Sequence, residues 1–213
     1  MTNVDILCLA NAWKKSPGRC IAGIDMDDGS WVRPVSDTKD GELTAGQCTM
    51  DAGRQVAPLD VVRVYLDSPA PRPHQPEDWL ISGRQWRLQG RLDIREAKKI
   101  LEEASELHDD GIFGTATDRV TLSQIDALPG RQIASSLTVV RATAPEFTWG
   151  RKRQQKRAVF GHAGVTYDLA MTFEDRPPVG ESASKWFFTV SLGEPFGSSC
   201  YKLVAGAIEV PTK

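Results

Sequence analysis

Short runs of apolar and β-branched residues, separated by Gly, Pro, Asp and Ser, fill the first part of the chain. Runs of this length that are bounded by turn-forming residues predict β-strands. They are Val4–Leu9, Cys20–Met26, Trp31–Val35, Leu59–Leu66, Trp79–Ile81 and Trp86–Leu88. Between the second and third runs, the sequence Asp27-Asp28-Gly29-Ser30 predicts a hairpin turn, because Asp and Gly tolerate positive φ.

The pattern changes at Ile94–His108, where apolar residues recur with helical spacing and charged residues fill the other positions. This spacing predicts an amphipathic helix. Asp93 and Glu96 predict a capping box at its start, and Gly111 predicts its end. A shorter helix is expected at Leu122–Leu128.

Strand-like runs then return and continue to the end of the chain. They are Ser136–Thr143, Glu146–Trp149, Arg157–Phe160, Val165–Thr172, Trp186–Leu192 and Cys200–Val210. Gly161–Gly164 is expected to form a turn and Gly193–Ser199 a loop.

Two clusters of about five strands, one on each side of a helix, predict a mainly β fold of two OB-like five-stranded barrels packed together. We expect a first OB-like domain at residues 1–92, a connecting helix at 93–110 and a second OB-like domain at 111–213. One continuous β-sandwich is the main alternative.

The composition is that of a folded protein, with 40% hydrophobic and 25% charged residues among 213. A formal net charge of −2 excludes a globally basic nucleic-acid binder, while a local basic patch remains possible.

The first basic residues follow the first apolar run, whereas a signal peptide has them before it, so we expect a cytoplasmic protein. The four cysteines form no CxxC pair, which favours free thiols over disulfides or a zinc site.

Common catalytic signatures are missing from the sequence, which contains no GxSxG, P-loop or GxGxxG motif. We therefore expect a non-enzymatic binding protein that has no catalytic residues, cofactor or metal.

The densest positive run lies in the second half of the chain. Its cations are Arg151, Lys152, Arg153, Lys156 and Arg157. Such a run can neutralise phosphates and release counterions. Trp149 and Phe160 flank it and can offer aromatic faces to bases. The simpler alternative is a solvated hairpin loop.

A second candidate surface involves Trp31 and Arg33, which alternation places on one face of a strand with Val32 on the other. If Val32 faces the core, Trp31 and Arg33 face outward together and suit a base and its phosphate. Alternatively, Trp31 is buried and Arg33 covers its edge. Arg19 is expected either to extend this surface or to be an ordinary surface charge. His74 lies in a proline-punctuated segment that forms either a structural clasp or a ligand contact.

Several longer motifs extend over nearly the whole chain. They are Ser16–Gly23, Trp31–Ser36, Leu59–Val62, His74–Trp79, Thr189–Phe196 and Cys200–Ile208. As a set they resemble a bacterial family described as dual OB domain-containing proteins. The resemblance implies two OB folds and, more weakly, nucleic-acid binding. It implies no catalytic residue.

These features favour a nucleic-acid-binding module whose partner is single-stranded DNA or RNA. One alternative is a sensor of a small nucleotide-like ligand bound between the two barrels. Another is a protein-interaction module that accompanies a separate enzyme. The acidic net charge favours the alternatives and the basic run favours nucleic acid. No membrane partner is expected, because the longest apolar runs are too short to cross a bilayer.

The contribution of the basic run is measurable through its salt dependence. Replacing Lys152 and Arg153 together by Glu is expected to weaken oligonucleotide binding and to flatten the dependence of log K on log salt by about one unit or more for each lost phosphate contact. Fluorescence anisotropy over a salt series measures both quantities. The control reverses two cations on the predicted helix, Lys98 and Lys99. An unchanged slope in the Lys152 and Arg153 variant would show that the run is only a solvated loop.

Overall fold

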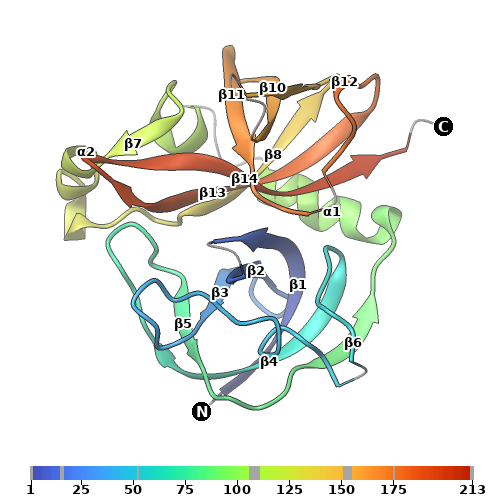
Figure 1. Ribbon diagram of the computed structural model, residues 1–213, viewed down its shortest axis with the longest axis vertical. Helices are drawn as coiled ribbons and strands as arrows, with labels where there is room; N and C mark the ends of the chain where they lie inside the picture. The colour runs from blue at the N-terminus through green and yellow to red at the C-terminus, as the bar shows by residue number, and fades with distance from the viewer. Residues whose placement is uncertain are drawn as a thin grey trace.

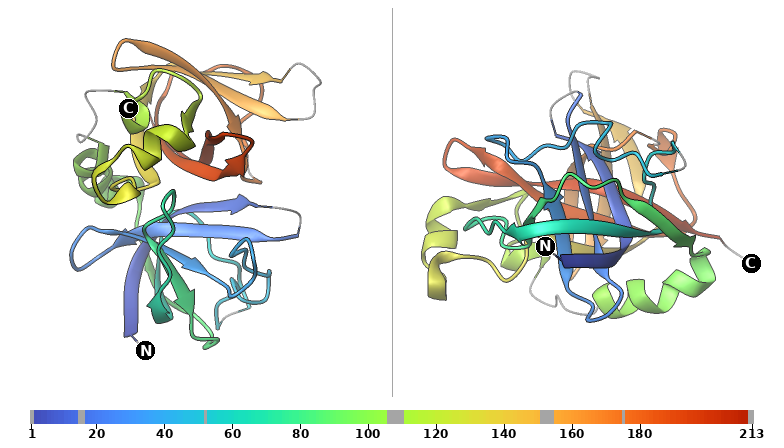
Figure 2. Two further views of the ribbon diagram at one scale, coloured as in Figure 1. Left: turned by 90° about the vertical axis from the view of Figure 1, so that its left-hand side faces the viewer. Right: turned by 90° about the horizontal axis from the view of Figure 1, so that it is seen from below.

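Two β-barrels stack on one another, with one helix beside their junction (Figures 1 and 2). The computed structural model describes residues 2–14, 17–51, 53–105, 111–150, 155–174 and 176–211. Sequence predicted a mainly β fold of two OB-like domains, and the structure confirms it. No helix among the described residues is both long enough and apolar enough to span a membrane.

The first barrel closes through five strands, and a sixth pairs with one end of β4. The strands are β1 (Thr2–Trp13), β2 (Arg19–Asp25), β3 (Trp31–Val35), β4 (Asp60–Pro69), β5 (Asp78–Ile81) and β6 (Arg87–Arg91). They follow the order β1-β2-β3-β5-β4, and β4 returns to β1, so that the sheet closes on itself. β3 and β5 are parallel and the other pairs are antiparallel, which is the strand circuit of an OB fold. This closure excludes the continuous sandwich.

The second barrel repeats this circuit. Its strands are β7 (Arg119–Thr121), β8 (Leu137–Thr143), β9 (Glu146–Trp149), β10 (Lys156–His162), β11 (Val165–Met171), β12 (Gly180–Glu181), β13 (Lys185–Phe196) and β14 (Ser199–Val210). β8 and β9 are two halves of one strand that bends at Ala144, where φ is 50°. One half pairs with β13 and the other with β10, while β11 and β14 are parallel. β8/β9, β10, β11, β13 and β14 therefore correspond to β1 through β5.

The observed helices and loops differ only slightly from those predicted from the sequence. The main helix, α1 (Ile94–Ser105), has the expected capping box, in which Asp93 accepts from the first-turn amides and Glu96 accepts from the Asp93 amide. Its predicted last residues, 106–108, lie outside the described part of the chain. α2 (Leu122–Asp126) is two residues shorter than expected. The predicted loop at Gly193–Ser199 was too long, because β13 continues to Phe196. Two short 3-10 turns lie at Ile112–Gly114 and Pro129–Arg131.

β1 joins the barrels because both of its faces are buried. Ile6 and Cys8 point into the first barrel's core. Leu7 and Leu9 point the other way, into an apolar cluster between the barrels. Second-barrel and helix residues complete that cluster, including Ala97, Leu101, Val139, Phe187 and Ile208. A strand buried on both faces has a nearly continuous apolar sequence, as this one does.

The two backbones approach closely at Gly206 in β14. A Cβ atom at this position would lie 2.1 Å from the carbonyl oxygen of Leu9. The hydroxyl of Thr189 donates a hydrogen bond to the same carbonyl over 2.9 Å. Only glycine therefore fits at position 206 when the barrels are in contact.

Replacing Gly206 with Ala tests this contact. We expect the free energy of unfolding to fall by about 1–3 kcal/mol or more, since backbone has to move to admit the methyl group. Chemical denaturation measures the change. Gly161→Ala is the matched control, because Gly161 also lies in a strand but has no atom within 4 Å of its Cβ position. Equal effects of the two substitutions would show that the contact is not tight.

Candidate nucleic-acid interface

The β9–β10 hairpin carries Trp149 and Lys156, two of the residues predicted from the sequence. Trp149, the last residue of β9, is 47% exposed and pairs across the hairpin with Lys156, the first residue of β10. The Nζ atom of Lys156 lies 5.7 Å from the centroid of the Trp149 ring, within the range of a cation–π contact. The Gly150 amide closes the hairpin by donating to the Gln155 carbonyl over 2.8 Å.

The remaining cations of the run differ in their surroundings. Lys156 donates to the carbonyls of Arg176 and Pro177, over 3.4 and 2.8 Å, and these two acceptors hold its ammonium group in place. Arg157 is paired with Asp168 over 2.6 Å, which neutralises it. The predicted residues Arg151, Lys152 and Arg153 lie outside the described part of the chain.

The first barrel has an equivalent pair, of which the sequence analysis named Arg19 but missed Trp13. Trp13 is the last residue of β1 and pairs with Arg19, the first residue of β2. The guanidinium of Arg19 lies 3.6 Å from the centroid of the Trp13 ring and is also paired with Glu174 over 2.9 Å. In sequence, basic residues follow each tryptophan: Lys14 and Lys15 after Trp13, and Arg151 onward after Trp149.

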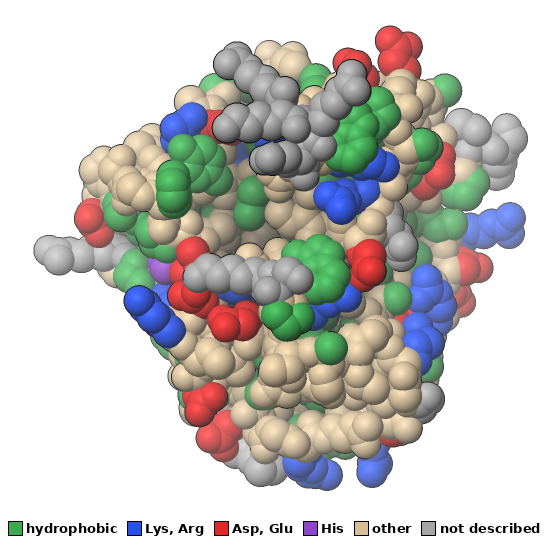
Figure 3. All heavy atoms as spheres, in the orientation of Figure 1, with side chains coloured by type: hydrophobic (Ala, Val, Ile, Leu, Met, Phe, Trp, Pro, Cys, Tyr) green, Lys and Arg blue, Asp and Glu red, His purple; other side chains and the backbone are tan. Residues whose placement is uncertain are grey.

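Both pairs contact residues between β11 and β12, namely Thr172, Glu174, Arg176 and Pro177. The Trp13 amide donates to the Thr172 carbonyl over 2.7 Å, Arg19 reaches Glu174, and Lys156 reaches Pro177. Figure 3 shows hydrophobic, basic and acidic side chains close together on the face seen in Figure 1, on the second barrel and at the junction below it. The two tryptophan–cation pairs are therefore parts of one surface that crosses both barrels.

Phe160 is not part of that surface, which corrects the prediction. It is 3% exposed and lies in the core of the second barrel, where it contacts Tyr167 and Phe188. The alternation along β10 explains the difference, because residues 158 and 160 face inward while 157 and 159 face outward.

Exposure of Trp31 and Arg33 on one face was one of two alternatives, and the surroundings of Arg33 do not fit it. Val32 does face the first core, as predicted, and Arg33 does point out of the barrel. The second barrel covers it, however, so that Arg33 is only 1% exposed. It pairs with Glu77 over 2.9 Å and donates to the Ser136 and Ser191 hydroxyls over 2.7 and 3.1 Å. Trp31 is half-buried against the apolar clusters between the barrels.

His74 belongs to a clasp between the barrels. Glu194 of β13 lies 2.6 Å from Lys14, 2.9 Å from Arg72 and 3.1 Å from the His74 ring. Burial alone would raise the pKa of Glu194. Hydrogen bonds from His74 and Lys14 and the charges of Lys14 and Arg72 outweigh it and hold the pKa well below its usual value.

The position of the second barrel determines which OB face is free. OB folds bind oligonucleotides on the face of strands 2 and 3 and on the adjoining loops. In the first barrel this face carries Arg33 and is covered. The corresponding face of the second barrel, on β10 and β11, is open, and Gly161, Thr166 and Asp168 are exposed there. A cavity of about 560 Å³ at its far end is lined in part by Glu146 and Glu181, so that end is acidic.

Among the described residues, no group of three or more His, Cys, Asp or Glu side chains is placed to hold a metal ion. All four cysteines are free, and Cys8, Cys48 and Cys200 are buried. Burial raises the pKa of the Cys48 thiol to about 12, which keeps it protonated and unreactive.

Two stacked barrels with one strand circuit define a dual OB-fold protein. Residues 4–207 match the family model described as the dual OB-containing domain, and the chain belongs to that family. No curated protein matches its sequence.

Several solved structures are similar over nearly the full chain. One is the HINb domain of p204, with 10% identity, a TM-score of 0.39 and coverage of 95% of each chain. Another is the HINa domain of Ifi202 in complex with 20-base-pair double-stranded DNA, with 9% identity, a TM-score of 0.39, and coverage of 98% of this chain and 95% of that chain. A murine DNA-binding protein bound to double-stranded DNA has 8% identity, a TM-score of 0.37, and coverage of 99% of this chain and 98% of that chain. Likenesses at these scores identify no ligand for this chain.

The Glu194 clasp predicts a pH dependence of stability. A carboxyl group whose pKa is lowered by folding stabilises the protein above its unfolded pKa, near 4.5, and loses that contribution as pH falls toward the folded value. Glu194→Gln is therefore expected to lower the free energy of unfolding by about 1–3 kcal/mol at pH 7. The difference from wild type should shrink below about pH 4.5.

Denaturation at several pH values measures this difference. The control is Glu103→Gln, since the Glu103–Lys99 pair is exposed and contributes little. A Glu194→Gln effect that does not change between pH 7 and pH 3 would contradict the assigned charge interaction.

Proposed function

We propose that this chain binds nucleic acid, single strands in preference to duplex, on the surface that joins its two tryptophan–cation pairs. The observation that carries the proposal is Trp149, whose ring is 47% exposed beside Lys156 and which stands just before the basic run in the sequence. Large aromatic residues are commonly buried, so exposure next to fixed positive charge favours a ligand with both aromatic and anionic groups.

An unpaired base suits this arrangement chemically. The face of the base can stack on Trp149, while Lys156 and the other cations of the basic run neutralise the adjoining phosphates. Stacking contributes about 1–3 kcal/mol per base, and a duplex cannot use it because its base faces are already stacked. This is the basis for the proposed preference for single strands.

The charges on the rest of the open β10–β11 face restrict where a nucleic-acid strand can lie. Arg157 is neutralised by Asp168, and Glu146 and Glu181 make the far end acidic. A strand is therefore attracted to the hairpin end and repelled from the far end. From Trp149 the other direction leads to Trp13 and Arg19. Arg19 is itself paired with Glu174, so this end offers the Trp13 ring more than free positive charge.

Protein interaction is the second candidate, and a separate feature favours it. Phe196, near the tip of the β13–β14 hairpin, is 77% exposed and lies 6.4 Å from the ring of Tyr201. An exposed aromatic residue of this kind suits docking to another protein. The small-ligand alternative has less support, since the Arg33–Glu77 pair fills the junction where that ligand was expected. Nucleic-acid binding and protein interaction are both binding functions, and neither proposal includes catalysis.

Trp149→Ala is the decisive variant. We expect a folded protein, with a free energy of unfolding within about 0.5 kcal/mol of wild type because the residue is exposed. Its affinity for a single-stranded oligonucleotide should fall about tenfold, whereas weak, salt-sensitive binding to duplex and heparin should remain. Fluorescence anisotropy with the three probes measures the preference.

Phe196→Ala is the matched control, because it removes another exposed aromatic ring from the same barrel. It should leave single-strand affinity unchanged under the proposed function. A Trp149→Ala protein that keeps full single-strand preference would refute the stacking role. If only the Phe196 variant lost affinity, the interface would lie at the β13–β14 hairpin instead.

A further inference from the structure

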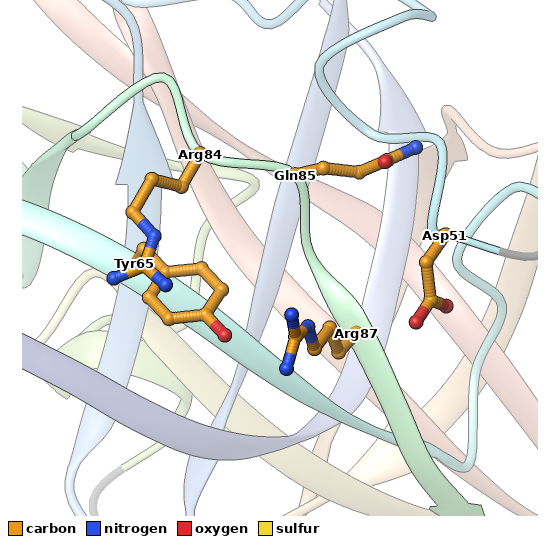
Figure 4. Close-up of a pocket in the computed structure, with 5 residues that line it drawn as sticks. All are labelled: Asp51, Tyr65, Arg84, Gln85 and Arg87. Carbon is orange, nitrogen blue, oxygen red and sulfur yellow. The ribbon is translucent and has the colours of Figure 1, made fainter.

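A second concave site lies on the β4–β6 side of the first barrel, which faces away from the second barrel (Figure 1). It is a cavity of about 370 Å³ lined by Asp51, Tyr65, Arg84, Gln85 and Arg87. Figure 4 shows these side chains around one space, with Arg84, Tyr65 and Arg87 on one side and Asp51 and Gln85 on the other. This pocket is separate from the residues of the proposed nucleic-acid surface.

Two arginines in the pocket, Arg84 and Arg87, have no ion-pair partner within the described part of the chain. The Arg84 guanidinium lies 4.1 Å from the centroid of the Tyr65 ring. Arg87 lies opposite Arg63 in the β4–β6 pairing, so Tyr65 is its diagonal neighbour on the same face. Asp5 neutralises Arg63 through two contacts of 2.7 Å. Among the described residues, neither Arg84 nor Arg87 forms an ion pair.

Hydrogen bonds and core packing hold the two chain segments that line the pocket against each other. Trp86, between the two arginines, is buried in the first core at 1% exposure. Its carbonyl accepts a hydrogen bond from the Asp51 amide over 3.1 Å. The Gln85 side chain donates to the Met50 carbonyl over 3.3 Å. A pre-organised site loses little conformational freedom on binding, which favours affinity for a small ligand.

We propose that this pocket binds the phosphate monoester of a small polyhydroxylated molecule, such as a sugar phosphate or a nucleoside monophosphate. Guanidinium groups match the geometry of phosphate oxygens, and the Tyr65 hydroxyl points toward Arg87 as a further donor (Figure 4). Asp51 and Gln85 on the opposite side offer acceptors for hydroxyl or amino groups.

The Asp51 carboxylate also selects against a polyanion. It repels a second phosphate placed beside it, so the pocket favours one phosphate attached to a neutral polar body. A nucleic-acid backbone would place phosphates on both sides of the cavity. The proposal does not depend on the function proposed for the Trp149 surface.

Isothermal titration calorimetry with ribose 5-phosphate tests the proposal, with ribose and inorganic phosphate as separate probes. We expect ribose 5-phosphate to bind at one site and more tightly than inorganic phosphate, and ribose to show no binding. Arg84→Gln and Arg87→Gln should each weaken ribose 5-phosphate by about tenfold or more, because each removes a charged hydrogen-bond donor. Arg95→Gln on α1, an exposed arginine elsewhere, should change nothing.

Three outcomes would overturn the proposal. They are no binding of ribose 5-phosphate to wild type, binding that both pocket variants retain, and equal affinity for inorganic phosphate. A single-stranded oligonucleotide distinguishes the two sources of phosphate. If the pocket variants weakened the oligonucleotide as much as ribose 5-phosphate, the pocket would belong to a nucleic-acid path. Far-UV circular dichroism establishes that each variant is folded.

Discussion

The burial of Arg33 against the second barrel determines which surfaces of this chain can meet a ligand. A guanidinium loses its hydration when it is buried, and this costs several kcal/mol unless an opposite charge and hydrogen bonds replace the water. Glu77 supplies the charge, and Ser136 and Ser191 of the second barrel supply the acceptors. The barrels therefore have to stay together for Arg33 to keep its two serine partners. As a consequence, the strand 2–3 face is covered in one barrel and open in the other.

Most of the fold could be predicted from the sequence because its signals are local. Apolar runs between turn residues located β1 to β6, and the capping box of Asp93 and Glu96 located the start of α1. The limits of β13 were harder to predict, since Gly193 and Pro195 indicate a loop while pairing with β14 continues the strand. The equivalence of the two barrels was also hidden, because it lies in strand order and not in shared sequence.

The candidate site could be predicted only in part. Alternation placed Arg33 outside the first barrel, but it contains no information about a second barrel that covers that face. The same alternation, applied along β10, could have placed Phe160 in the core. Trp13 was missed because only two cations, Lys14 and Lys15, follow it directly in the sequence. A tryptophan followed directly by basic residues, in both halves of the chain, was the signal that could have identified it.

The shared carbonyl of Leu9, which accepts from Thr189 and lies against Gly206, leaves the barrels no room to pivot. The distance between the two tryptophan–cation pairs is then fixed by the packing of the barrels. A ligand held at one pair presents its next units to the other at a constant effective concentration, and no flexible linker dilutes it. Length and stiffness of the strand, more than its base sequence, would then decide how well both pairs are occupied at once.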